Sequence, residues 1–171
     1  MTTIAYANGI IASDSQVTSG ETIYSRMPKI HRLSSGGLMG FAGACDHRDM
    51  VALFDKVKQT RHLPTRKAIL DIQCDTDGLF IMPNGMVYYV ECMHRKGVWE
   101  GGLYPASEKF AACGSGGKFA LVAIECGKNA VEAIHLACRR DTNSCPPVHQ
   151  LSLGLRKIVP SRSKQAPRRR R

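Results

Sequence analysis

The chain has 171 residues, of which 43% are hydrophobic, as expected for one globular domain large enough to bury about two-thirds of its unfolded surface. No apolar run approaches the roughly 18 residues of a membrane span, and no basic segment followed by an apolar one marks a secretory signal. These features argue against a membrane protein and a secreted protein. We therefore expect a protein of the cytoplasm.

The net charge of +10 is concentrated at the C-terminal end. Residues 155–171 carry eight cations and no acid, and without them the net charge falls to +2. We predict a single domain over residues 1–159 and a basic, disordered tail over residues 160–171. The tail is interpreted as a solubilising segment, a docking arm for an acidic partner surface, or a segment with weak affinity for nucleic acid.

The seven cysteines are scattered and form no Cys-x-x-Cys pair. We predict that they are reduced and mostly buried. The Cys-x-His spacings at Cys45 and Cys92 are tighter than those of known structural zinc sites, so no metal site is predicted from them.

The first part of the chain is predicted to form short strands. Residues 3–7 and 10–13 flank Asn8-Gly9, a strong signal for a two-residue hairpin turn. The polar residues 15–27 are predicted as a loop or a twisted connection. Residues 29–33 and 38–42 are predicted as a second pair of strands, joined by a Ser-Gly turn.

Helices are predicted next. The first begins near residue 46, with Asp46 as its N-cap, and its apolar residues share one face: Met50, Leu53, Phe54 and Val57. Residues 65–73 form either a short second helix capped by Thr65 or a strand.

The second half repeats this alternation. Strands are expected at 79–82, 86–91, 99–104 and 109–113, helices at 119–126 and 130–140, and a closing strand at 148–158. This order predicts an α+β fold with two antiparallel sheets packed together and helices on both outer faces.

Six short segments, in this order, resemble those of one known family: Thr2-Thr3-Ile4, Ser13 to Val17, Lys29 to Leu33, Gly40 to Gly43, Cys113 to Gly117, and Arg140 to Ser144. The chain thereby resembles the proteasome β-subunits, including HslV, among the N-terminal nucleophile hydrolases. The resemblance runs from Thr2 to about Leu153. It implies a four-layer αββα sandwich with two antiparallel sheets between helical layers.

The resemblance also implies a threonine-type endopeptidase. Removal of Met1 would expose Thr2, whose hydroxyl attacks a peptide carbonyl with its own α-amine as general base. Lys29, paired with Asp14, would favour the alkoxide-like state, and the backbone N–H of Gly43 would stabilise the oxyanion. The expected site is completed by Ser115, Asp141 and Ser144 near the amine and by Phe41 in a substrate pocket.

Further expectations follow from the same resemblance. They are a homo-oligomer of stacked rings, polypeptide substrates, an ATP-dependent unfoldase as partner, and no cofactor required for catalysis. A structural monovalent or divalent cation near Asp141 and Ser144 is also allowed, although Cys145-Pro146-Pro147 departs from the family pattern. Two alternatives remain open: an amidase acting on small amides, and a catalytically inactive shell or scaffold protein that retains Met1.

Overall fold

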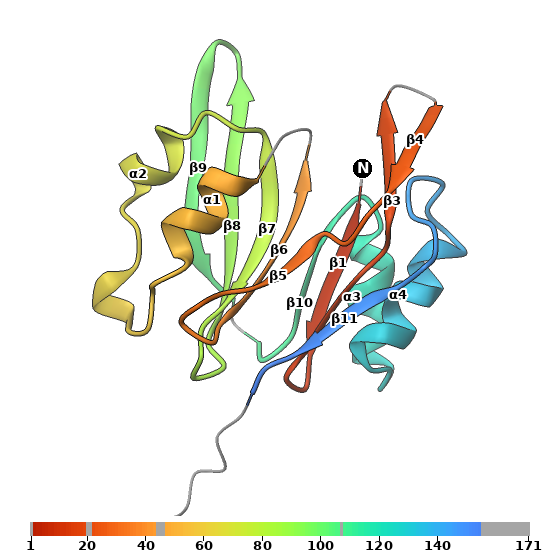
Figure 1. Ribbon diagram of the computed structural model, residues 1–171. Coiled ribbons are helices and arrows are strands. Elements are labelled where there is room, and N and C mark those ends of the chain that lie inside the picture. Colours follow the sequence, from red (N-terminus) through yellow and green to blue (C-terminus); the bar gives the residue numbers. More distant parts are fainter. Residues whose placement is uncertain (1, 20–21, 44–46, 107, 155–171) are drawn as a thin grey trace, which may run out of the picture.

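The chain is seen in a computed structural model that describes residues 2–19, 22–43, 47–106 and 108–154. Three antiparallel sheets account for its strands (Figure 1). The first sheet has the order β10-β1-β2-β11, the second is the β3-β4 pair, and the third has the order β5-β6-β7-β8-β9.

The four-stranded sheet is built around the predicted N-terminal hairpin. It contains β1 (Thr3–Ala7), β2 (Ile10–Ser13), β10 (Ala111–Gly114) and β11 (His149–Ser152). Asn8 and Gly9 both have positive φ, which the tight hairpin turn requires. The prediction of this hairpin is confirmed.

Three further hairpins build the five-stranded sheet. Its strands are β5 (Ile30–Arg32), β6 (Leu38–Gly43), β7 (Thr76–Ile81), β8 (Val87–Arg95) and β9 (Val98–Pro105). A turn at Pro83-Asn84-Gly85 joins β7 to β8, and Gly85 has a positive φ.

The described chain contains four α-helices. They are α1 (Arg48–Phe54), α2 (Arg66–Leu70), α3 (Gly117–Glu125) and α4 (Ala130–Cys138), with a 3-10 turn, η1 (Thr60–His62), before α2. Thr65 caps α2 by accepting a hydrogen bond from the N–H of Ala68, as predicted. The predicted cap Asp46 lies outside the described residues.

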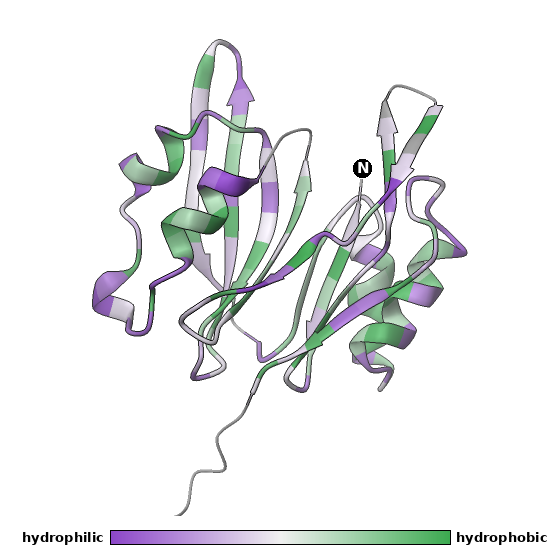
Figure 2. Ribbon diagram, viewed as in Figure 1, coloured by the Kyte–Doolittle hydropathy of each residue, from purple (hydrophilic) through white to green (hydrophobic). Residues whose placement is uncertain are grey.

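Alternating side chains on the strands create three apolar cores. On β1, Ile4 and Tyr6 face the core between the two larger sheets, whereas Ala5 and Ala7 face α3 and α4. On β6, Met39 and Phe41 face a third core that contains residues of α1 and α2. Figure 2 shows apolar residues along the strands and helices of the body.

The fold-class prediction needs correction. It described a four-layer αββα sandwich made from two antiparallel sheets, whereas the described chain has three antiparallel sheets in a mixed α+β fold. The third sheet comes from residues predicted as a loop, which form β3 (Gln16–Ser19) and β4 (Thr22–Arg26). This β3-β4 ribbon projects from the end of the molecule at which the N-terminus lies (Figure 1).

Candidate functional site

A buried ion pair occupies the junction between the four-stranded sheet and the β3-β4 ribbon. Asp14 follows β2 and is fully buried, and Lys29 precedes β5 and is 7% exposed. The Lys29 Nζ lies 3.1 Å from Asp14 Oδ1 and 3.2 Å from Oδ2, and it also donates to the carbonyl of Gln16. Burial lowers the pKa of Lys29, and the adjacent Asp14 opposes that shift.

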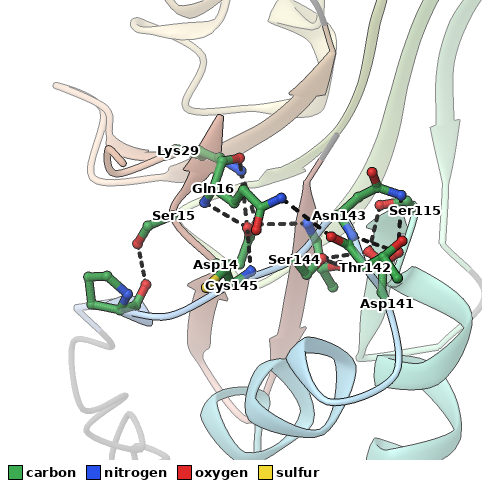
Figure 3. Close-up of polar contacts among 12 residues, drawn as sticks. Asp14, Ser15, Gln16, Lys29, Ser115, Asp141, Thr142, Asn143, Ser144 and Cys145 are labelled. Carbon is green, nitrogen blue, oxygen red and sulfur yellow. Dashed lines mark hydrogen bonds and ion pairs between the residues drawn. The ribbon is translucent and has the colours of Figure 1, made fainter. Parts of the chain in front are cut away.

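The Asp14 carboxylate also binds backbone N–H groups from three segments of the chain. Oδ1 accepts from Thr3 at 2.9 Å, and Oδ2 accepts from Gln16 at 2.9 Å and from Cys145 at 3.3 Å. The Asp14 carboxylate is therefore hydrogen-bonded to the first strand, to the start of the ribbon and to the loop after α4 (Figure 3).

A second polar cluster is centred on Asp141, just after α4. Asp141 Oδ2 accepts from the hydroxyls of Ser115 at 2.7 Å and Ser144 at 2.6 Å. The Ser144 hydroxyl also lies 2.6 Å from Thr3 Oγ1. Burial alone would raise the pKa of Asp141, but hydrogen bonds from Ser144, Ser115 and Asn143 hold it below its usual value.

Removing one of these hydrogen bonds is expected to raise the pKa of Asp141. Because its pKa is depressed by folding, Asp141 stabilises the fold above the pKa of the unfolded chain, and this contribution is lost as the pH falls through the folded pKa. We expect the Asp141 carboxyl of Ser144→Ala to titrate at higher pH than in wild type, as measured by carboxyl carbon NMR. Ser152→Ala, on β11, serves as the control, and an unchanged titration in Ser144→Ala would contradict the assignment.

The remaining predicted site residues lie in two separate places, a pocket and a buried core. Thr2, which is 4% exposed, lines a pocket of about 610 Å³ together with Gly43 and Ser115. Asp14, Lys29, Asp141 and Ser144 are not among its described lining residues. Phe41 is fully buried in the core beside α1, where its ring stacks on His47 with centroids 4.7 Å apart, so its side chain packs inside the protein.

Two glycines bring backbone segments close together beside Thr2. Gly114 has a φ of +83°, and a Cβ there would collide with the carbonyl of Thr2. That carbonyl accepts from the Ser115 N–H at 3.0 Å. Gly43 has a φ of +146°, and a Cβ there would collide with the carbonyl of Asp75. Both positions require glycine.

Gly114→Ala is therefore expected to lower the free energy of unfolding by roughly 1–3 kcal/mol more than Gly127→Ala. Gly127 has a similar φ, +85°, but an added Cβ there meets open space. The difference between the two variants in denaturant unfolding isolates the collision with Thr2. Equal destabilisation would contradict this account.

Several residues of these clusters were not predicted. Thr3 and Gln16 contribute hydrogen bonds to the Asp14 cluster, and Asp77 lies in the wall of the pocket. Asp77 is the second residue of β7, upstream of the strand predicted at 79–82. The sequence signal that could have identified Asp77 was a carboxylate within a stretch that otherwise resembles a strand.

The cysteines differ in part from the prediction. Cys74 is disulfide-bonded, whereas Cys92, Cys113, Cys126, Cys138 and Cys145 are free. Among the described residues, no group of three or more His, Cys, Asp or Glu side chains is placed to hold a metal ion. The cation expected near Asp141 and Ser144 stays a prediction. No helix in the described ranges is both long and apolar enough to cross a bilayer.

Comparison with known proteins gives a likeness to solved structures. No family model and no curated protein sequence matches the chain. Among solved structures, the chain is similar to Thiobacillus denitrificans BPH, with a TM-score of 0.59 and 21% sequence identity over 89% of this chain and 97% of that chain. A likeness at this level of identity shows a shared fold.

These findings correct the sequence-based assignment. No model of the proteasome β-subunit or N-terminal nucleophile hydrolase family matches the chain, and the structural likeness carries no activity with it. The identification as a proteasome-like threonine endopeptidase is therefore withdrawn, together with its polypeptide substrates and unfoldase partner.

Proposed function

We propose that the chain is a structural subunit of the cytoplasm that associates with copies of itself, in the manner of a shell or scaffold. The observation that carries the proposal is the β3-β4 ribbon, which projects from the body (Figure 1). An isolated two-stranded ribbon is only marginally stable in water, and it gains stability when another surface covers it.

The ribbon also exposes apolar side chains. Ile23 on β4 is 52% exposed, and Met27, directly after β4, is 53% exposed. The ribbon's extensive contacts are between its own two strands, so these side chains are left uncovered by the body. A second copy of the chain is the occupant proposed here, because the same ribbon on both partners would bury two such sets of side chains.

The buried ion pair supports this role by fixing the base of the ribbon. Gln16, the first residue of β3, donates its N–H to Asp14, and its carbonyl accepts from Lys29. At the other strand, the N–H of Met27 donates to the carbonyl of Ser15 at 3.0 Å. A projecting ribbon that is anchored in this way can present its apolar residues in a defined orientation.

The proposal assigns a structural role to the predicted site residues. Asp14 and Lys29 hold the ribbon, whereas Asp141 joins Ser115 to Ser144 and so connects the turn after β10 with the loop after α4. Each of these groups has hydrogen-bond partners within the protein. Thr2 and Gly43 are interpreted as parts of a pocket wall.

Intact mass after exposure to a threonine-directed covalent inhibitor tests the proposal against an enzymatic role. We expect a purified chain that retains Met1 and forms no adduct, alongside a particle of several subunits. A chain that lacks Met1 and is labelled in wild type but not in Thr2→Ala would contradict the structural role.

A further inference from the structure

A pocket of about 610 Å³ lies beside Thr2, and its volume is in the range of small-molecule sites. Its walls come from both larger sheets. One wall holds Asp77 and Met93 of β7 and β8, and the other holds Gly114 and Ser115 at the end of β10. The rest of the lining is mostly polar, with Ala42 and Gly43 as its small apolar members and Thr18 contributed by β3.

Asp77 is the unusual group in this wall. Its Oδ2 accepts from the Gly114 N–H at 2.9 Å, and no other hydrogen bond or ion pair of its carboxylate occurs in the described part of the chain. Asp77 lines the pocket and is partly buried, and its Oδ1 accepts no hydrogen bond from the described residues, so this oxygen is open to a ligand. Burial raises the pKa of Asp77, although the hydrogen bond from Gly114 opposes the shift.

The charged groups around Asp77 leave its charge uncompensated. Glu91 lies opposite it on β8 and is also acidic, and Asp75 lines the same pocket. Two basic side chains, His94 and Arg95, also line the pocket, at the exposed end of β8. The Arg95 guanidinium contacts the sulfur of Met93 at 3.2 Å, and neither side chain pairs with Asp77 in the described part of the chain. A partly buried carboxylate without a counter-charge gains from a ligand cation.

We propose that this pocket binds small molecules that carry a cationic head group, an amidinium or a primary ammonium, on an apolar body. The head group would pair with the open oxygen of Asp77, and the body would lie against Ala42 and Met93. The inference concerns the ligand class of the pocket and goes beyond the proposed self-association.

The test compares benzamidine with benzamide, its neutral isostere, by ligand-observed saturation-transfer NMR titration on the full chain. We expect wild type to bind benzamidine roughly tenfold or more tightly than benzamide, because a charged hydrogen bond is lost in the neutral compound. Asp77→Asn should abolish this preference, and Asp71→Asn should keep it, because Asp71 is an exposed carboxylate directly after α2 and is not among the described residues that line the pocket.

Met93→Trp provides a second variant that keeps Asp77 and fills the pocket, and it should weaken benzamidine binding. The proposal is overturned if wild type binds both compounds equally, or if the preference survives in a folded Asp77→Asn. Benzamidine binding that is unaffected by Met93→Trp would also overturn it, because the ligand would then lie elsewhere.

Discussion

Asp14→Ala is expected to lower the free energy of unfolding by about 3–5 kcal/mol, which is the typical effect of removing one partner of a buried ion pair. The loss arises because Lys29 stays buried at 7% exposure without its counter-charge. The N–H groups of Thr3 and Gln16 also lose their acceptor. Urea unfolding, followed by circular dichroism, measures the change.

Two further variants make this prediction specific to the ion pair. The double variant Asp14→Ala/Lys29→Met should recover part of the loss, because it removes the unpaired buried charge. Lys67→Met removes the exposed Lys67–Asp71 pair, in which the two side chains are 84% and 62% exposed, and should change stability little. If Asp14→Ala unfolds like wild type, the ion pair does not hold the ribbon to the body.

Ile23→Glu is expected to convert the assembled protein to single chains. Ile23 is 52% exposed on a ribbon that few other parts of the chain cover, and a carboxylate buried between two copies would lie unpaired in an apolar contact. Size-exclusion chromatography with light scattering should show loss of the larger particle at unchanged secondary structure.

Thr22→Glu is the matched control for this variant. Thr22 directly precedes Ile23 on β4, so its side chain points to the other face of the ribbon, and it is also exposed. The control adds the same charge and should retain the assembly. Dissociation in both variants would indicate charge repulsion, and assembly in both would exclude the Ile23 face as the contact.

Much of the fold could be predicted because the sequence signals for its elements lie within short segments of the chain. Asn8-Gly9 specifies a hairpin turn through the φ values that only a few residues accept, and the structure has that turn. The β3-β4 ribbon was missed for the opposite reason. A strand is recognised by alternation between a buried and an exposed face, and Gln16 to Ser19 lack this pattern because the ribbon does not pack on a core.

The candidate site was predicted in part. The Asp14–Lys29 pairing is present, but sequence could not show how many backbone groups share that carboxylate, because these come from segments as distant as Cys145. Phe41 was expected in a substrate pocket, yet the alternation of β6 turns it into the core beside α1. The roles expected for these residues came from a family resemblance that the comparisons do not support.

The central claim, that this chain is a self-associating structural subunit, is tested most directly by native mass spectrometry of the wild-type protein at micromolar concentration. The account predicts particles whose mass is a multiple of 18.8 kDa, the mass of one chain. A protein that remains at the mass of a single chain under these conditions would contradict it.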